Sequence, residues 1–359
     1  MQRDAPPDLA ELTLADLELW VASAGLPRYR AAQIFQWVWR RGATSFDAMS
    51  DLPRELRARL SAELPFTTPT VVRDELSVDG TRKLVLRFAD RREIECVYIP
   101  DTPSQTFCVS TQVGCAMGCA FCLTGRMGLV RHLTAGEIAG QVRVLATATG
   151  LLDRAFNIVL MGMGEPLHNY DATMRALALL HEPKGFALPP KRVTLSTVGL
   201  VPMLDRLAQE PLMPNLAISL HATTEAQRAS IVPPTKKYGL AAIVEACRRF
   251  PVAKRSRITF EYVLLAGVND SLADARRLVT LLDGVKAKVN LIPLNAAPGI
   301  PFERPSDAAV DAFARTLADR GMTVSVRRSR GRDIRAACGQ LIVEGGRTKS
   351  AAQTLAAAL

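Results

Sequence analysis

Three of the seven cysteines in this 359-residue sequence fall within eight residues. Cys115, Cys119 and Cys122 are separated by three and then two residues, in a glycine- and alanine-rich segment that lets the backbone fold round a metal cluster. Structural zinc normally takes four protein ligands, and no fourth cysteine or histidine lies nearby at matching spacing. An iron–sulfur cluster of the 4Fe–4S type is usually held by four thiolates, so three would leave one iron open.

Polar residues at the ends of short apolar segments form a second candidate set. Taken singly, a Gly-x-Gly step or a lone histidine is more often a turn or a core residue. Several of them at successive strand ends indicate a ligand pocket instead. The residues concerned are Gly164, Glu165, Ser196, Ser219, His221 and Asn295.

A parallel sheet would bring these residues together. Short apolar segments alternate with helical stretches and predict six strands, at residues 107–110, 157–161, 192–196, 216–219, 258–265 and 289–294. One intervening helix should begin with a capping box formed by Thr134 and Glu137. Six such units predict an α/β fold, an incomplete (β/α)6-type barrel with its chemistry at the carboxyl ends of the strands.

The residues before the barrel divide into two further segments. A helical pattern covers residues 14–64, and the Asp79-Gly80 step predicts a hairpin turn before alternating strands at 83–88 and 94–99. We therefore expect a helical N-terminal domain at 1–66 and a β connector at 67–103. The partial barrel and a C-terminal cysteine loop should then occupy 104–343, followed by a tail at 344–359.

An excess of basic residues points to an anionic partner. Lys and Arg number 45 against 35 Asp and Glu, a net charge of +10, which favours nucleic acid. Arginines at 28, 30, 40 and 41 lie among Tyr29, Trp37 and Trp39, a pattern that fits either an RNA grip or a helix with an aromatic core and solvated arginines. A second basic run, at 327, 328, 330, 332 and 335, leads up to Cys338 and would bring phosphates to it.

The cysteine count and the N-terminus indicate a compartment. An odd number of cysteines, three of them crowded together, is a poor disulfide framework and suits a reducing environment. The N-terminal residues lack the pattern of a secretory signal, and no apolar run approaches the roughly 18 residues of a membrane span. We expect a cytoplasmic protein that does not enter a membrane.

The C-x3-C-x2-C spacing after the first strand of a partial barrel resembles the signature of the radical S-adenosylmethionine enzymes. The chain is further similar to the RlmN type of these enzymes over nearly its whole length. The segments that carry this similarity are MGMGEPL at 161–167, TLST at 194–197, SLHA at 219–222, NLIP at 290–293 and DIRAACGQL at 333–341. RlmN-type enzymes methylate carbon 2 of adenosine in the peptidyl-transferase region of 23S rRNA and in tRNA, at the adenosine 3′ of the anticodon.

The resemblance implies two cofactors. One 4Fe–4S cluster would be held by Cys115, Cys119 and Cys122, and its open iron would bind S-adenosylmethionine, of which two molecules are used per turnover. In the family the polar groups of that molecule are bound at Gly164, Glu165, Ser196, Ser219, Leu220, His221 and Asn295, with Leu220 contributing backbone. The resemblance also implies an external one-electron donor, flavodoxin-like or similar. We expect the enzyme to be a monomer.

The resemblance also assigns three catalytic residues. Cys338 would first take a methyl group, which after loss of a hydrogen atom adds to carbon 2 as a methylene radical and crosslinks protein to RNA. Glu95 would remove the carbon-2 proton, and Cys108 would separate Cys338 from the methylene carbon, ending in a Cys108–Cys338 disulfide that is later reduced. From pattern alone, Glu95 is a polar residue on a strand and Cys108 a small buried hydrophobe. No motif includes Cys96 or Cys247, for which core packing is the better interpretation.

Two other functions share many of these features. The related branch that methylates carbon 8 of the same ribosomal adenosine has all the quoted motifs, and we favour carbon 2 because the helical N-terminal domain suits an enzyme that also handles tRNA. A non-catalytic iron–sulfur protein that binds RNA or transfers electrons would need only the cluster and the charge. That function would not explain the polar residues at the strand ends or the pair Cys108 and Cys338.

The three-cysteine motif generates a test of its own. Protein reconstituted anaerobically should bind about four irons and show the absorbance shoulder of a 4Fe–4S cluster. Replacing Cys115, Cys119 or Cys122 with alanine should abolish both signals, whereas Cys247→Ala should leave them unchanged. Zinc at full occupancy without iron, in anaerobically purified protein, would contradict the prediction.

Overall fold

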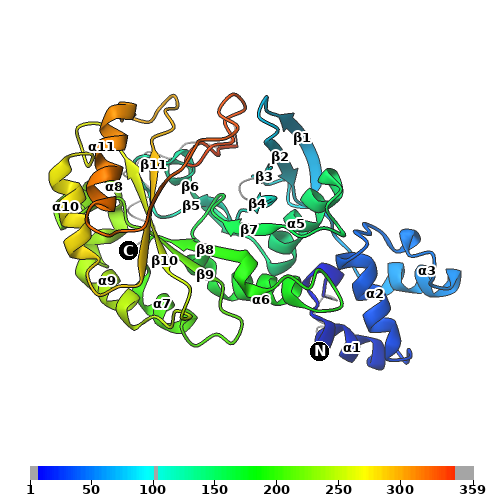
Figure 1. The fold of residues 1–359 in the computed structure, drawn as a ribbon. Helices are drawn as coiled ribbons and strands as arrows, with labels where there is room; N and C mark the ends of the chain where they lie inside the picture. The colour runs from blue at the N-terminus through cyan, green and yellow to red at the C-terminus, as the bar shows by residue number, and fades with distance from the viewer. Residues whose placement is uncertain (1–6, 101–103, 344–359) are drawn as a thin grey trace.

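One sheet of ten strands runs through most of the molecule. The computed structural model describes residues 7–100 and 104–343, and its main sheet has the order β1-β2-β3-β4-β7-β8-β9-β10-β11-β12 (Figure 1). Strands β1 to β4 are antiparallel neighbours, and every pairing from β4 onward is parallel. A separate two-stranded ribbon is formed by β5 (Gln112–Cys115) and β6 (Gly128–His132).

All six predicted barrel strands are present. They are β4 (Thr106–Cys108), β7 (Asn157–Leu160), β8 (Val193–Thr197), β9 (Asn215–Ser219), β10 (Ile258–Leu264) and β11 (Ala287–Pro293). Helices cover them on the outer side, so these strands are mostly buried and read as short apolar runs. A seventh parallel strand, β12 (Val324–Val326), pairs with β11 and was not predicted, because three residues, two of them exposed, beside an arginine run carry no strand signal. The α/β partial barrel is confirmed.

Helices on the outside complete the βα units. They are α5 (Ala135–Thr149), α6 (Tyr170–His181), α7 (Val201–Leu207), α8 (Glu225–Ile231), α9 (Leu240–Arg249), α10 (Leu272–Leu281) and α11 (Asp307–Ala318). Figure 1 shows α7 to α11 along the outer side of β8 to β11. The predicted capping box is present at the start of α5, where the Thr134 side chain accepts from the Glu137 N–H and Glu137 accepts from the Thr134 N–H. In the part of the chain that the structure describes, no helix is long and apolar enough to cross a bilayer.

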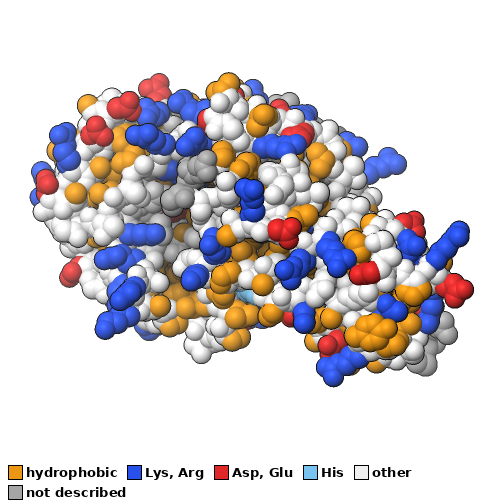
Figure 2. Space-filling view, turned by 45° about the vertical axis from the view of Figure 1, so that its right-hand side comes forward, with side chains coloured by type: hydrophobic (Ala, Val, Ile, Leu, Met, Phe, Trp, Pro, Cys, Tyr) orange, Lys and Arg blue, Asp and Glu red, His pale blue; other side chains and the backbone are white. Residues whose placement is uncertain are grey.

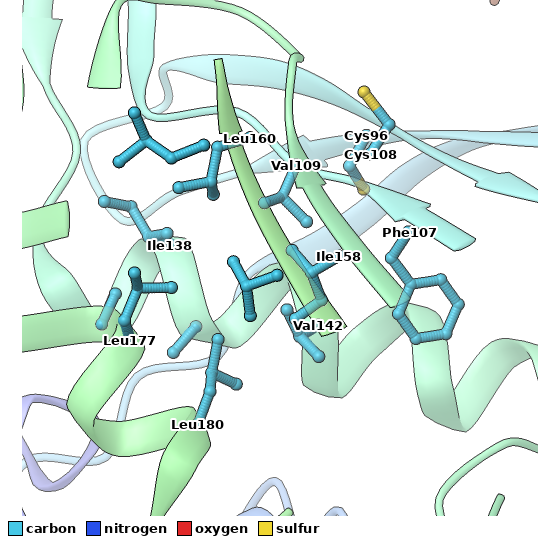
Figure 3. Close-up of a cluster of buried hydrophobic side chains, with 14 of the residues drawn as sticks. Cys96, Phe107, Cys108, Val109, Ile138, Val142, Ile158, Leu160, Leu177 and Leu180 are labelled. Carbon is cyan, nitrogen blue, oxygen red and sulfur yellow. The ribbon is translucent and has the colours of Figure 1, made fainter. Parts of the chain in front are cut away.

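Helices α5 and α6 pack on the first barrel strands and form part of the core. Figure 3 shows this contact, which involves Ile138 and Val142 of α5, Leu177 and Leu180 of α6, and Val109, Ile158 and Leu160 near the strands. Cys96 and Cys108 lie side by side at its edge, on paired strands, with their sulfur atoms pointing in opposite directions. Cys96 and Cys247 are both buried in the apolar cluster, in agreement with a packing role.

The N-terminal helices lie at one end of the sheet. These are α1 (Leu14–Ser23), α2 (Tyr29–Trp39) and α3 (Arg54–Glu63). The guanidinium of Arg143, from α5, lies over the rings of Trp39 and Phe66, 5.5 and 5.1 Å from their centroids. It also donates to the Thr68 hydroxyl at 2.8 Å, and its side chain is almost wholly buried. On the same helix, Gln141 makes two 2.8 Å hydrogen bonds to the backbone of Ser110.

Two of the arginines predicted to grip RNA already have acidic partners. Arg28 pairs with Glu18 at 2.7 Å and Arg41 with Asp51 at 3.3 Å. Trp39 is 1% exposed and belongs to the core, whereas Tyr29 is 60% exposed. The aromatic-core interpretation therefore holds for Trp39, while Tyr29 remains available at the surface.

The β connector continues the barrel sheet. Strands β1 (Thr70–Leu76), β2 (Arg82–Arg87) and β3 (Glu93–Ile99) join it through the antiparallel pairing of β3 with β4. The predicted turn is present, with Gly80 at φ +81°, a conformation that favours glycine. In Figure 1 the tip of this hairpin lies beside the orange-red segment that follows β12.

The capping box at α5 yields a stability test. Thr134→Ala removes the acceptor for the Glu137 N–H and should lower the free energy of unfolding by about 1 kcal/mol, measured by denaturant titration. Thr134→Ser keeps the hydroxyl and should lose less than half of that. Equal losses in both variants would mean that the methyl group, not the cap, stabilises the helix start.

Candidate active site

A single pocket at the carboxyl ends of the barrel strands collects most of the predicted site residues. Its lining includes the three motif cysteines and the polar strand ends. From the predicted set it contains Cys115, Cys119, Cys122, Gly164, Glu165, Ser196, Ser219, His221, Asn295 and Cys338. Leu220, Glu95 and Cys108 lie outside that lining. The structure therefore brings ten of the thirteen predicted site residues together in one pocket, while their roles remain predictions.

The cysteine motif is shaped by tight turns. Cys115 ends β5, and Cys122 is the N-cap of the short helix α4 (Leu123–Arg126). Gly114 has φ +75°, and a Cβ there would come within 1.9 Å of the Gly128 carbonyl oxygen, so only glycine fits. Burial raises the pKa of Cys115 and Cys119, and the neighbouring thiols raise it further. Burial also raises the pKa of Cys122. Without a bound metal all three are neutral thiols.

The donor set fits a cluster better than a single ion. Among residues 7–100 and 104–343, no group of three or more His, Cys, Asp or Glu side chains is arranged to hold one metal ion. The three thiols nevertheless line the same pocket. In a 4Fe–4S cluster each thiolate binds a different iron, so the sulfur atoms need not converge on one point.

Glu165 is a buried carboxylate at the end of β7. Its two oxygens accept the N–H groups of Leu167 and Val198 at 3.0 and 2.9 Å, and its own N–H donates to the Gln112 side chain at 2.8 Å. Burial raises the pKa of Glu165 to about 7, against the lowering effect of those N–H donors. The preceding Gly164 has φ +108°, and a Cβ there would lie 2.7 Å from the Gln112 side chain. Glu165 is thus an acidic group suited to an ammonium.

Two serines and a second glutamate line the next strand ends. The Ser196 hydroxyl lies 3.3 Å from that of Ser219 and donates to Glu261, on β10, at 3.0 Å. Glu261 is 5% exposed and was not predicted. Its signal in the sequence is a single acid within an otherwise uncharged strand, ITFEYVL at 258–264. Together the three side chains can accept and donate hydrogen bonds to a polar ligand.

His221 is neutral and fixed in orientation. Its Nδ1 accepts the Val263 N–H at 3.1 Å, so the ring carries its hydrogen on Nε2. Burial, with Arg228 nearby, lowers the pKa of His221 to about 3. Arg228, fully buried, donates to the carbonyl oxygens of Leu220, Ser219 and Val198 at 3.0, 3.1 and 2.6 Å. It was not predicted, and it stabilises the strand ends on which the other residues lie.

The loop that carries Cys338 is anchored against the cysteine motif. The Leu123 N–H donates to the Gly339 carbonyl oxygen at 2.8 Å, and the Asn295 amide donates to the Cys338 carbonyl oxygen at 3.2 Å. The Thr124 hydroxyl donates to the Leu341 carbonyl oxygen at 2.6 Å. Asn295 therefore acts on the loop itself as well as lining the pocket.

Cys108 and Glu95 are not part of the pocket lining. Both Cys108 and Cys338 are free thiols, near enough to interact electrostatically. Burial raises the pKa of Cys108 to about 12, and Cys338 adds to that rise. Glu95 is 2% exposed and forms a 3.0 Å ion pair with Lys83, while the Ile342 N–H donates to its other oxygen at 2.8 Å.

The arginine run after β12 divides between the site and the surface. Arg327 interacts with Cys338, which is the main cause of its raised pKa, and also with Glu261 and Cys108. Arg328 and Arg332 are exposed. Figure 2 shows Lys and Arg side chains spread widely over one face of the molecule. Arg327 therefore differs from its neighbours, since its charge lies beside the thiols.

Two family profiles match the chain. The Radical SAM superfamily matches residues 109–279, and the Ribosomal RNA large subunit methyltransferase N-terminal domain matches residues 7–64. A crystal structure of a radical SAM methyltransferase from Sphaerobacter thermophilus has a TM-score of 0.90 and 50% identity, covering 94% of this chain and 99% of the other. Fold and site thus define a radical S-adenosylmethionine enzyme.

Full-length relatives narrow the class. A dual-specificity RNA methyltransferase RlmN of Anaeromyxobacter sp. (strain Fw109-5) is 50% identical, covering 95% of this chain and 92% of its own. The protein of the same name from Syntrophobacter fumaroxidans is 47% identical, and the match covers 95% of this chain and 99% of that protein. The chain belongs to the RlmN family, whose cofactors are a 4Fe–4S cluster and S-adenosylmethionine, two molecules per turnover.

The pKa of Glu165 predicts how cofactor binding depends on pH. Only the carboxylate form can pair with an ammonium, and burial has raised the pKa of this group to about 7. The dissociation constant for S-adenosylmethionine should therefore rise about tenfold as the pH falls from about 8 to about 6. Equilibrium dialysis with cluster-loaded Cys338→Ala protein, which holds the cofactor without loading a methyl, measures it. Glu165→Gln should bind more weakly and show no such dependence; an identical dependence in that variant would assign the titration to another group.

Proposed function

We infer that this protein methylates carbon 2 of adenosine in 23S rRNA and tRNA, at the peptidyl-transferase region and at the adenosine 3′ of the anticodon. Membership of the RlmN family supports an RNA methyltransferase that uses a radical mechanism. The observation that carries the proposal is the position of Cys338, whose loop places a thiol in the same pocket as the three motif cysteines. A non-catalytic iron–sulfur protein would have no use for that thiol.

The residues of the pocket suit the binding of S-adenosylmethionine. When bound, the cluster and this cofactor supply a methyl group and a carbon radical. Glu165 would hold the ammonium, while Ser196, Ser219 and the Nε2–H of His221 offer hydrogen bonds and Leu220 contributes backbone. Gly164 gives the ligand close access to backbone, and Asn295 serves both the ligand and the Cys338 loop. Cys115, Cys119 and Cys122 would hold the cluster.

Cys338 and Cys108 would act at different stages. Cys338 takes the methyl as a thioether and becomes linked to carbon 2 through the methylene carbon. The adduct of the methylene radical with the ring is itself a radical. As Glu95 removes the carbon-2 proton, the adduct gives up one electron, for which the cluster, when bound, would be the acceptor. The Cys108 sulfur then bonds to the Cys338 sulfur as the bond from Cys338 to the methylene carbon breaks, and the released carbon takes a proton to become the methyl group. A two-electron reduction restores both thiols.

Arg327 supports this assignment electrostatically. It counteracts the effect of burial on the pKa of Cys338 and Cys108, which favours the thiolate form that both steps need. Methylation of carbon 8 would use the same cysteines, so the thiols do not separate the two reactions. Carbon 2 is favoured by the RlmN relatives and by the match of the N-terminal domain profile.

Several further properties belong to the same proposal. Reduction of the cluster requires an external one-electron donor, flavodoxin-like or similar, and a reducing cytoplasm would keep the seven cysteines as thiols. We propose that the enzyme works as a monomer. We also keep the division into a helical domain at 1–66, a β connector at 67–103 and a barrel at 104–343. The tail proposed at 344–359 lies outside the described residues.

Removal of each thiol should stop the reaction at a different stage. With Cys338→Ala no methyl is loaded, so neither methylated protein nor methylated RNA should form. With Cys108→Ala loading and addition proceed, and RNA should remain attached to Cys338 as a slow band in a denaturing gel that RNase removes. Cys247→Ala is the matched control and should behave like the wild type.

Mass spectrometry of the RNA locates the product. In RNA from a deletion strain the methyl should be missing from carbon 2 of the target adenosines, and the wild-type gene should restore it. Normal methylation by Cys108→Ala, or activity of Cys338→Ala, would mean that the methyl travels directly from cofactor to base. A methyl found on carbon 8 would replace the proposed regiochemistry.

A further inference from the structure

A row of ionisable residues crosses the β connector and points toward the site. Glu75 on β1 is directly opposite Lys83 on β2, and Lys83 is directly opposite Val97 on β3. Val97 in turn is opposite Cys108 on β4. Residues directly opposite each other share one face of a sheet, and Glu95 shares the face of Val97 because it lies two residues away. Lys83, Glu95 and Cys108 therefore face the same side.

Lys83 bridges the two glutamates. Its Nζ lies 3.0 Å from Glu95 Oε1 and 2.9 Å from Glu75 Oε2. The side chains of Lys83 and Glu95 are 5% and 3% exposed, whereas that of Glu75 is 31% exposed. A buried carboxylate without a cation is costly and tends to take up a proton. Lys83 is thus the group that allows Glu95 to stay ionised.

Glu95 is also joined to the loop of Cys338. Its second oxygen accepts the Ile342 N–H at 2.8 Å, four residues beyond that cysteine. Before Cys338, the same loop is held by the hairpin turn of the connector. The Ser77 hydroxyl donates to the Asp333 carboxylate at 2.6 Å, and the Asp79 carboxylate accepts the Gly331 N–H at 2.9 Å. The connector therefore holds the loop at both ends, and the pairing of Lys83 with Glu95 lies at one of them.

We propose that Lys83 is a positioning residue for the methyl transfer: it keeps Glu95 a carboxylate, and through Glu95 it holds the segment that follows Cys338. The inference rests on the proposed function, in which Glu95 accepts the carbon-2 proton while the electron pair of that C–H bond stays with the adenine ring. A protonated Glu95 could not accept it. Lys83 itself touches neither substrate nor cofactor and acts through Glu95.

The charges around Glu95 give the proposal a distinctive sign. Burial raises the pKa of Glu95, Lys83 and the Ile342 N–H lower it, and Glu75 raises it slightly. The neighbouring Cys96 is a neutral thiol because burial raises its pKa. The rate of crosslink resolution should fall at low pH as Glu95 becomes protonated, and we call this part of the pH profile the acid limb. Loss of Lys83 should therefore move the acid limb to higher pH. Loss of Glu75 should move the same limb to lower pH.

The test follows resolution of the protein–RNA crosslink in cluster-loaded, full-length protein with a tRNA transcript. Denaturing gels taken over time and over a range of pH give its rate for each variant. At pH 7, Lys83→Met should resolve the crosslink at least about tenfold more slowly than the wild type, and higher pH should restore most of the rate. Lys83→Arg should behave like the wild type, and Glu95→Gln should stay slow at every pH.

Glu75→Gln is the matched variant, since it changes the exposed partner of the same lysine. Its acid limb should shift in the opposite direction, a result that a merely destabilised sheet would not give, and it tests the proposal even if Lys83→Met folds poorly. A Lys83→Met defect that does not depend on pH, an unshifted limb in Glu75→Gln, or normal resolution by Lys83→Met would overturn it. Wild-type protein that forms neither methylated RNA nor a crosslink would overturn the proposed function as well.

A second measurement needs no turnover. Hydrogen exchange at the Ile342 amide, in protein without RNA, should be at least about tenfold faster in Lys83→Met at pH 7, because a neutral Glu95 is a weaker acceptor. Lys83→Arg should leave the exchange rate unchanged. Equal rates in Lys83→Met and the wild type would show that Lys83 does not hold the loop, whatever the enzyme methylates.

Discussion

One backbone hydrogen bond joins the two halves of the chemistry. The Leu123 N–H, directly after the last motif cysteine, donates to the carbonyl oxygen of Gly339, directly after Cys338. The close approach depends on Gly339, whose φ is +80° and where a Cβ would lie 3.1 Å from the Phe121 carbonyl oxygen. This contact brings together residues more than two hundred positions apart in the sequence. The hydrogen bonds from Asn295 and Thr124 reinforce it.

Burial controls the ionisation of that pocket. The motif thiols are neutral without metal, so binding of the cluster must release protons. Glu165 titrates near neutrality for the same reason. Arg327 opposes the trend, since its charge stabilises the thiolate forms of Cys338 and Cys108. This low-dielectric site therefore contains both acidic and basic groups, and its ligands must supply the opposite charges.

The sequence predicted the elements that repeat and the residues that belong to motifs. The six strands and the capping box of α5 follow from periodicity and local hydrogen bonding, which depend on neighbours in the chain. The fit of Cys115, Cys119 and Cys122 to one pocket follows from their spacing. The roles of Glu95 and Cys108 came from family resemblance and remain predictions.

Features that depend on packing between distant segments escaped the sequence. Glu261 is a lone charge in an apolar strand, which indicates burial without naming its partner. Arg228 and Lys83 are preceded by polar residues, in EAQRASI at 225–231 and RKLVLR at 82–87, so their burial has no local signal. In the sequence Arg327 resembles its neighbours in the basic run, and its electrostatic interaction with Cys338 has no local signal. The pairing of Arg28 with Glu18 likewise joins residues ten positions apart, and no local pattern encodes it.

Helix α5 connects the N-terminal helices to the strand ends. The guanidinium of its Arg143 lies over the rings of Trp39 and Phe66. Two residues earlier, Gln141 makes hydrogen bonds to the backbone of Ser110, two residues beyond Cys108. If the N-terminal helices were removed, Arg143 would lose its contact with the Trp39 ring, and apolar side chains now buried in the shared core would be exposed to water. We therefore expect the N-terminal helices and the barrel to unfold together, in one cooperative transition.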